Sequence, residues 1–434
     1  MMQQDPTNLS LRKTTHTHIE NTHDVYIREE IASIFPDKKI YFATDYPDPN
    51  LAYTRNPRMT VGFMGKSRYD FHEIQYMNQD HLQEVKDQKA FLVCEMFVES
   101  SPSYISRMYM RCIKAGIPTG QVILVGSSMD FKMYSDKCAN IHKVNPMIIV
   151  YYTFYERLMK RELLLGSIAD ETIDKNCSLK TLESLVSLDL VKTTDPLSIN
   201  QFKKRFIFLN HISRPHRALM LILLNSHDLL KYGYVSFLST NKEFIDLKLE
   251  GLIKNLFPDP EQYDKSLDIM NKIPLYVDEC LRVKVNGHTI DPGRIGLTSL
   301  HEYVNHSFFH LTSETYFQDK EQRLMDGEYK NRFLTEKTFK SIAFKQPFII
   351  ISLPGTLEII RKLGYKTFSP WIDESYDTVE SGIDRLRKIS LEVKRLCELD
   401  ENTIEEYRKE LIPIIEYNYN LLMSRKDFFH YPIN

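Results

Sequence analysis

The chain has 434 residues, more than a single hydrophobic core usually supports, so its length predicts two domains. Hydrophobic residues make up 42% and charged residues 26% of the chain, which is an ordinary globular composition and predicts a sizeable buried core. The formal net charge of −2 excludes an overall electrostatic attraction to nucleic acid or to an anionic membrane, and leaves only a local basic surface for such a role.

The cysteine spacing and the N-terminal residues indicate the cellular compartment in which the protein is expected. The six cysteines lie far apart without paired short spacings, which argues against a zinc site and a disulfide scaffold and fits a reducing compartment. Residues 1–25 are polar, contain no apolar core of a secretory signal, and are predicted to form a flexible tail. Since no apolar window has the length of a membrane span, the sequence predicts a cytoplasmic protein.

The first half of the chain alternates segments of strand and helix character. A helical apolar stripe runs through residues 104–115, with Ser103 placed as its N-cap and Gly116 at its end. This alternation predicts a parallel α/β domain over residues 26–195, with the polar residues 193–200 as the linker. Strands are predicted where short runs are rich in β-branched or aromatic residues, at 39–43, 91–98, 121–125 and 147–152.

The second half repeats this alternation. Strands are predicted at 205–210, 234–238, 308–311, 347–352 and 366–368, and helices at 217–231, 242–256, 335–344 and 356–363. Residues 383–423 are predicted to be helical, because apolar residues recur there at helical spacing. The predicted fold is therefore α/β, with two Rossmann-like domains at 26–195 and 200–380 facing a central cleft, and C-terminal helices at 383–434.

The segment from Asn210 to Arg217 follows a predicted strand, opens a predicted helix and carries two arginines three residues apart. In an open α/β sheet, ligands bind at the carboxyl ends of the strands. Guanidinium groups there suit a diphosphate, because their donors are fixed and multidentate. We therefore predict that Asn210, Arg214 and Arg217 contribute to a diphosphate site. The alternative is a helix begun by Pro215, with solvated arginines.

Glu314 ends a second predicted strand, and Thr335-Glu336-Lys337 opens a later helix. A carboxylate at a strand end can bind ribose hydroxyls, while a lysine and the free N–H groups of a helix start face phosphates. These residues, with Lys340 one turn further along, are predicted to bind a sugar nucleotide. The alternative is an exposed helix of ordinary composition, in which Glu336 serves only the helix dipole.

The pattern Glu314-Thr315 followed by Phe333-Leu334-Thr335-Glu336-Lys337 resembles the donor-binding signature of α1,3-fucosyltransferases. In that family a Glu is followed, after a loop, by an aromatic-x-Thr-Glu-Lys run, and Thr315 stands where the family has Asn. The segment from Asn210 to Arg217 is similar to the family's Asn…Arg segment, whose arginine binds the donor diphosphate. The resemblance covers residues 205–352 and implies donor-binding roles for these positions.

Residues 347–377 resemble a block of largely virus-encoded glycosyltransferase-like proteins, some of which glycosylate modified bases in phage DNA. The two resemblances imply a GT-B glycosyltransferase, either a hexosyltransferase or a pentosyltransferase, acting in the host cytoplasm if viral. They place the donor in the C-terminal domain and the acceptor mainly on the N-terminal one. The chain contains no Asp-x-Asp, the motif that usually binds a divalent cation in the other major glycosyltransferase architecture. We therefore predict a metal-independent enzyme without a cofactor.

Three further motifs have two interpretations each. In the acidic segment 373–377, Asp373, Glu374 and Tyr376 are predicted to contact the sugar, and the alternative is a solvated turn with a helix cap. Residues 61–67 end like a phosphate-binding P-loop but lack its first glycine, so we reject an ATPase. Histidines 301, 306 and 310 have no supporting acidic or cysteine ligands in the sequence, so we predict no metal site.

An inverting displacement needs a general base near the acceptor hydroxyl. Glu95 is predicted in this role because it lies near the end of an N-terminal strand, with Glu99 and Asp45 as further candidates. A structural role for Glu95 is the alternative.

The acceptor is predicted to be a glycan or a hydroxymethylated base in DNA. Two basic segments, 53–68 and 104–115, are the candidates for contact with DNA, and both have solvated faces as the alternative. The alternative to an enzyme is a non-catalytic two-domain protein that binds a nucleotide or sugar, or that is structural. The sequence leaves the oligomeric state open.

Overall fold

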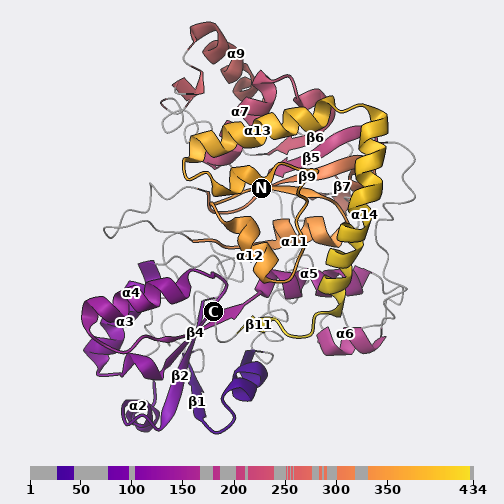
Figure 1. Ribbon diagram of the computed structural model, residues 1–434. Helices are drawn as coiled ribbons and strands as arrows, with labels where there is room; N and C mark the ends of the chain where they lie inside the picture. The colour runs from indigo at the N-terminus through magenta and orange to yellow at the C-terminus, as the bar shows by residue number, and fades with distance from the viewer. Residues whose placement is uncertain are drawn as a thin grey trace, which may run out of the picture.

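The described residues form two large α/β sheets of mainly parallel strands, each covered by helices (Figure 1), and one two-stranded antiparallel sheet. The two large sheets confirm the predicted α/β class. The computed structural model describes residues 27–43, 77–96, 103–166, 179–185, 202–210, 214–238, 251, 253–254, 256–257, 259–275, 283–285, 288–290, 301–317 and 331–430. No helix among these residues is long and apolar enough to cross a membrane.

The N-terminal sheet runs in chain order and is extended by the C-terminal end of the chain. Four parallel strands of this sheet are β1 (Lys39–Phe42), β2 (Ala90–Met96), β3 (Val122–Gly126) and β4 (Ile148–Tyr152). The fifth strand, β11 (Phe429–His430), pairs antiparallel with β4. All five residues of β3 are buried, which is the expected result for an apolar run in the middle of a sheet covered on both faces.

Helices cover both faces of this sheet. One face carries α2 (Gln79–Lys86), α3 (Ser103–Ala115) and α4 (Phe131–His142), and a short 3-10 turn, η5 (Thr119–Gln121), precedes β3. The other face packs on the helix at residues 27–34 and on α5 (Phe154–Gly166), beside α6 (Leu179–Leu185). Ser103, predicted as an N-cap, is the first residue of α3, whereas Gly116 follows this helix with φ +66°, the left-handed backbone that ends helices.

The C-terminal sheet has the order β10-β9-β5-β6, with all strands parallel. Its strands are β5 (Lys204–Asn210), β6 (Gly233–Phe237), β9 (Ser307–Ser313) and β10 (Phe348–Ile351). The chain leaves β5 toward β6 on one side and later crosses to β9 on the other side. The strand order therefore reverses between β5 and β9, which is the place where open α/β sheets bind ligands.

Opposite crossovers put helices on opposite faces of this sheet. The helix α7 (Pro215–Ser226), which follows β5, is buried from His216 to Leu224, because it packs on α9 (Pro260–Asn271) and on a C-terminal helix. The helix α11 (Glu336–Ala343), between β9 and β10, packs on the other side against α5 and so joins the two domains. The remaining elements are η7 (Leu230–Tyr232), β7 (Val283–Val285), β8 (His288–Ile290), α10 (His301–Asn305), α12 (Thr356–Lys362) and η12 (Glu374–Thr378).

The C-terminal helices begin at the residues that cap them. The side chains of Ser381 and Asp400 accept backbone N–H groups at the starts of α13 (Gly382–Glu398) and α14 (Glu401–Ser424). The predicted apolar stripe of α13 is fully buried, at Leu386, Ile389, Val393 and Leu396. The helices predicted in the C-terminal segment are α13 and α14, and the chain then continues from α14 into β11, which returns to the N-terminal sheet.

Two other predicted elements differ in the structure. Residues 366–368 form no strand, since the N–H and C=O groups of Lys366 bond instead to the side chain of Asn418 on α14. The helix predicted at 217–231 ends at Ser226, and residues 230–232 form the 3-10 turn η7. The predicted linker at 193–200 and most of the helix at 242–256 lie outside the described residues.

Candidate functional site

The predicted donor residues gather at the carboxyl edge of the C-terminal sheet. They lie on both sides of the switch point, the place between β5 and β9 where the strand order reverses. The register that pairs Ile207 with His310 places Asn210, the last residue of β5, level with Ser313, the last residue of β9. Residues that are about 100 positions apart in the chain therefore end their strands side by side. The start of α7 follows β5, and α11 is the next helix in the chain after β9 (Figure 1).

Buried polar atoms without hydrogen-bond partners mark this edge. Asn210 and Ser313 are only 4% and 5% exposed. Within the part of the chain that the structure describes, Asn210 Nδ2 and Ser313 Oγ are buried and have no hydrogen-bond partner, and the same holds for Arg214 Nε. Buried polar groups are almost always satisfied, so three such atoms at one edge are groups that a polar ligand would satisfy.

Arg217, one of the residues predicted to form the diphosphate site, lies beside the end of β9. One of its terminal guanidinium nitrogens donates weakly to the carbonyl oxygens of Ser313 and Glu314, at 3.4 and 3.5 Å. His216 Nε2 is 3.0 Å from the same Glu314 oxygen, and its ring stacks on Phe317. Burial, with the nearby charge of Arg217, lowers the pKa of His216 well below its usual range, so the imidazole is neutral. Arg217 therefore supplies the positive charge here.

Glu314 is fully buried and holds the start of α11. Its carboxyl oxygens accept the N–H of Thr335 at 3.0 Å, the Thr335 hydroxyl at 2.5 Å and the Thr338 hydroxyl at 2.5 Å. The predicted contact of this carboxylate with ribose hydroxyls does not fit that geometry, because both oxygens are already bonded inside the protein. Glu314 instead fixes the position of the Thr-Glu-Lys triplet.

The triplet begins α11 as the sequence predicts. Thr335 is the N-cap, and its hydroxyl accepts from the backbone N–H of Lys337. Lys337 Nζ lies 3.1 Å from the same hydroxyl and 2.9 Å from Glu336 Oε1, with the Glu336 and Lys337 side chains each 30% exposed. A partly exposed ammonium group therefore lies at the positive end of a helix, which is a suitable arrangement for an anion.

Lys340 extends this positive region by one helical turn. Burial opposes ionisation of Glu336, but the charges of Lys337 and Lys340 outweigh it and hold the Glu336 pKa at about 2. Burial, with the charge of Lys340, lowers the pKa of His310 on β9 to about 3. His310 is therefore neutral and adds no charge near the start of α11.

The two domains meet immediately before the triplet. Phe333 is 1% exposed and packs edge-on against Tyr155 of α5, at a ring distance of 5.7 Å. Its backbone forms a β-bridge with Ser128, just after β3. The aromatic position of the motif thus anchors the donor segment on the N-terminal domain.

An ion pair that the sequence prediction missed joins the same segments. Arg332 Nη2 lies 2.6 Å from Asp130 Oδ1, and its Nε and backbone N–H also donate to that carboxylate. Burial opposes the charge of Arg332, but the bonds to Asp130 outweigh it and raise the Arg332 pKa. Only the position of Asp130, five residues after the end of the strand predicted at 121–125, could have marked it as a candidate.

Glu95 lies in β2, opposite Val125 of β3, and is partly buried. Its charge contributes to the raised pKa of the buried Tyr152, so the two side chains are close. The other candidate bases, Glu99 and Asp45, and the basic segment 53–68 lie outside the described residues.

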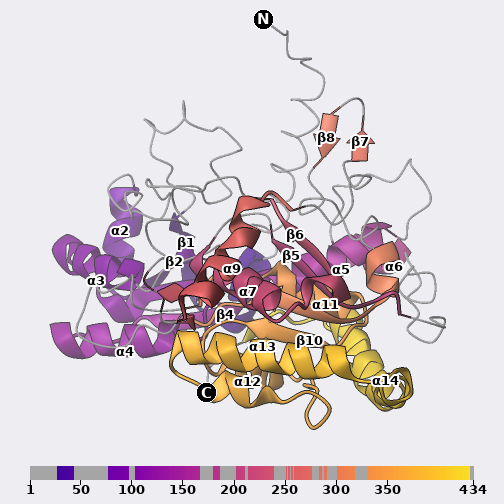
Figure 2. The same cartoon turned by 90° about the horizontal axis from the view of Figure 1, so that it is seen from above.

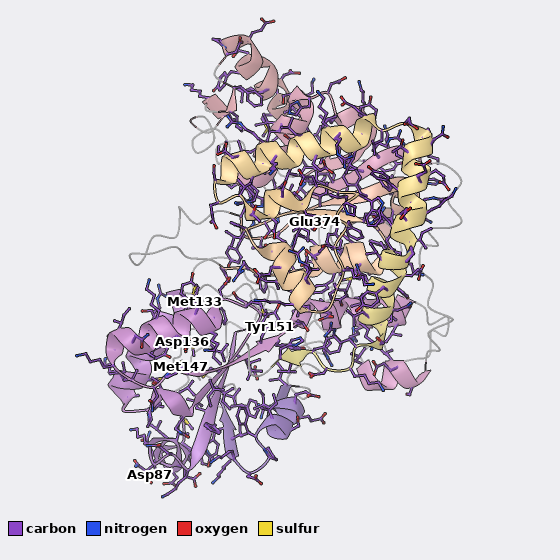
Figure 3. All side chains as sticks on the ribbon, in the orientation of Figure 1. Asp87, Met133, Asp136, Met147, Tyr151 and Glu374 are labelled. Carbon is purple, nitrogen blue, oxygen red and sulfur yellow. The ribbon has the colours of Figure 1, made fainter. Side chains whose placement is uncertain are left out.

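The polar atoms of the acidic segment 373–377 bond to neighbouring parts of the C-terminal domain. Glu374, labelled in Figure 3, accepts the N–H of Phe368 at 2.6 Å and the hydroxyl of Thr367 at 2.9 Å. Asp373 caps η12, and Tyr376 is 1% exposed, with its hydroxyl oxygen accepting from Ile350. The structure therefore gives all three predicted sugar contacts structural partners.

Asp377, in the same segment, accepts two N–H groups at the start of α12, and burial raises its pKa to about 6. Among the described residues, no group of three His, Cys, Asp or Glu side chains could hold a metal ion.

Comparisons with known proteins add one remote likeness. No model of a protein family matches the chain, and no curated protein matches its sequence. Among solved structures, the chain is similar to the N-terminal domain of Candida albicans trehalose-6-phosphate phosphatase. The identity is 10%, the match covers 84% of this chain and 75% of that chain, and the TM-score is 0.32. A likeness at this score supports no conclusion about fold family or function.

Proposed function

We propose that this protein is a GT-B-like glycosyltransferase that binds a nucleotide-sugar donor at the switch point of its C-terminal sheet. The observation that carries the proposal is the set of unpartnered buried polar atoms on Asn210, Arg214 and Ser313, beside the start of α11. The motif resemblance of the triplet and of the Asn210 to Arg217 segment to α1,3-fucosyltransferases supports the same site.

The charges at this edge suit a diphosphate. Arg214 and Arg217 come from the start of α7, and Lys337 from the first turn of α11. Glu314 links them, because its carbonyl accepts from Arg217 while its carboxyl group holds Thr335. These side chains and the N–H groups of α11 would stabilise the negative charge that develops on the leaving nucleoside diphosphate. In this scheme the protein itself neutralises the leaving group, without a metal ion.

The acceptor hydroxyl would be activated from the N-terminal domain, where Glu95 remains the predicted general base of an inverting displacement. The acceptor is proposed to be a glycan or a hydroxymethylated base in DNA. We expect Glu95→Gln to abolish transfer while donor binding persists. Unchanged turnover in that variant would remove Glu95 from the mechanism.

Donor binding is testable by thermal unfolding with a panel of nucleoside diphosphates. We expect at least one of GDP, UDP, CDP, ADP and dTDP to raise the melting temperature by several degrees at 100-fold excess over its Kd, since binding at that excess adds about 2.7 kcal/mol. Lys337→Ala should abolish this shift while the free protein stays folded, with a melting temperature lowered only by the loss of the partly exposed ion pair between Lys337 and Glu336.

A matched control is Lys362→Ala on α12, where the lysine pairs only with Glu358. This variant should keep the full ligand-induced shift. If no nucleoside diphosphate stabilises the protein, or if Lys337→Ala and Lys362→Ala respond alike, the donor site is wrongly placed. Mass spectrometry of glycans and hydroxymethylated DNA, incubated with the stabilising nucleotide as its sugar conjugate, would then identify the acceptor.

A non-catalytic nucleotide- or sugar-binding protein is the second candidate. It is favoured by one observation, namely that the buried carboxylates of Glu314 and Asp130 at this junction are both bonded to protein groups. Binding of a nucleoside diphosphate without any hydrolysis or transfer from the matching nucleotide sugar would support this candidate over the enzyme.

A further inference from the structure

The outward faces of α3 and α4 form an exposed apolar surface that the donor site does not use. Met110 and Ile113 on α3 are 54% and 41% exposed, and Met133 and Ile141 on α4 are 47% and 54% exposed. Four of the six large apolar residues that are exposed in the described part of the chain therefore lie on these two helices.

The two helices present these residues in a common direction. Their inward faces pack on the same face of the N-terminal sheet, through residues such as Met108 and Cys112 of α3 and Tyr134 and Cys138 of α4. The two helices also pack against each other. Since both bury one face against the same sheet, both turn the opposite face outward. Figures 1 and 2 show them together at one side of the molecule, away from α14.

The same helices carry a strong local excess of positive charge. Residues 103–115 and 131–143 contain six basic residues and one acidic residue, a net charge of +5, whereas the whole chain has a net charge of −2. The acidic residue is Asp136, which lies 2.9 Å from Lys132 within α4 and is labelled with Met133 in Figure 3. The basic residues are Arg107, Arg111, Lys114, Lys132, Lys137 and Lys143.

We propose that the outward face of α3 and α4 docks on an anionic lipid bilayer. Basic side chains there would meet phosphate headgroups, and the exposed methionine and isoleucine side chains would enter the boundary between headgroups and acyl chains. The surface suits nucleic acid less well, since the described aromatic residues of these helices, Tyr109, Phe131 and Tyr134, are buried and cannot stack on bases. This binding is independent of the proposed donor site.

Vesicle sedimentation with the full chain tests the proposal. We expect the protein to sediment with vesicles of phosphatidylcholine containing 30% phosphatidylserine, and to remain in solution with phosphatidylcholine alone. Binding should fall when the salt concentration rises from 0.1 to 0.5 M, because screening weakens exposed charges. Lys114→Glu with Lys137→Glu should lower the partition coefficient by about tenfold or more. Met110→Gln with Met133→Gln should lower it at unchanged charge.

Two control variants carry the same chemical changes on the other domain. Leu391→Gln replaces a 56% exposed residue of α13, and Lys409→Glu reverses an exposed charge on α14. Both should bind vesicles like the unaltered protein, and circular dichroism should show that all variants are folded. Equal sedimentation with anionic and neutral vesicles would overturn the proposal. It would also be overturned if the α3 and α4 variants bound anionic vesicles as strongly as the unaltered protein. If the α3 and α4 variants lose binding to a DNA oligonucleotide but keep their binding to vesicles, the surface belongs to a nucleic-acid site instead.

Discussion

At the scale of single residues, Glu314 connects the two halves of the candidate donor site. Its carbonyl oxygen receives Arg217 and His216 from α7, and its carboxyl group receives Thr335 and Thr338 from α11. Because every polar atom of this side chain is bonded and fully buried, its contribution is to orientation rather than to direct contact with a ligand.

Glu314→Gln is expected to lower the free energy of unfolding by about 2 kcal/mol, since the amide can no longer accept all three hydrogen bonds and one buried donor loses its partner. Urea unfolding would measure this loss. The comparison variant is Glu410→Gln at an exposed position of α14, which should lose less than about 0.5 kcal/mol. Similar losses for both variants would contradict the supporting role of Glu314.

Glu336 should make stability depend on pH in the acid range. Its pKa falls from 4.5 to about 2 in the folded protein, because Lys337 and Lys340 outweigh the effect of burial. A lowered pKa stabilises the folded state above pH 4.5, and this stabilisation is lost as the pH falls toward 2. Between pH 5 and pH 3, the unaltered protein should lose about 1 kcal/mol more stability than Glu336→Gln, as measured by urea unfolding at each pH. If the unaltered protein and Glu336→Gln lose the same stability between pH 5 and pH 3, the lysines do not lower the pKa of Glu336.

At the scale of elements, the end of β3 carries the contact between the domains. Gly126 ends this strand, and a Cβ atom there would come within 2.3 Å of the Phe131 ring, so only glycine allows α4 to start so close to the strand. The turn between them holds Ser128 against Phe333 and places Asp130 against Arg332. The N-terminal domain and the segment before α11 are thereby fixed to each other.

The Asp130–Arg332 pair should be strongly coupled. We expect Asp130→Asn and Arg332→Gln each to lower the free energy of unfolding by about 2 kcal/mol, because each leaves a charged partner partly buried without its counter-ion. The double variant should lose about as much as either single one, which gives a coupling energy of about 1–3 kcal/mol.

The exposed pair Lys132–Asp136 on α4 is the matched control for that cycle, with an expected coupling below about 0.5 kcal/mol. If the two cycles give the same coupling, the contact between the domains does not depend on Asp130. A weaker affinity of Asp130→Asn for the stabilising nucleotide would connect this contact to the donor site.

At the scale of the whole molecule, the chain crosses between the sheets twice. It passes from β4 and α5 to β5, and it returns from α14 to β11 at the edge of the first sheet. The returning segment is held by Phe429, which is 4% exposed and stacks on Tyr152 at a ring distance of 4.6 Å. The N–H of Thr153 donates to the carbonyl of Phe428 beside it.

Phe429→Ala should therefore lower the free energy of unfolding by about 3 kcal/mol, through lost burial and a cavity beside Tyr152. Urea unfolding would measure the loss, and hydrogen exchange should increase most in β4. Leu391→Ala, an exposed truncation on α13, should change stability by less than about 0.5 kcal/mol. A loss for Phe429→Ala no larger than that for Leu391→Ala would show that the return to the first sheet contributes no stability.

The sequence by itself determined the α/β class, the approximate strands of both sheets and the start of α11 at Thr335. These features depend on apolar spacing and on capping residues within a few positions of each other, which can be read locally. It also grouped Asn210, Arg217, Glu314 and Lys337, because strand ends of a parallel sheet meet at one edge.

Only the tertiary structure decided the order β10-β9-β5-β6, the pairing of Asp130 with Arg332 and the return of β11 to the first sheet. It also turned Glu314 inward, toward two threonine side chains, rather than toward a ligand. Each of these facts depends on contacts between residues that are tens to hundreds of positions apart in the chain. No local pattern encodes such contacts, because they arise when complete elements pack against each other.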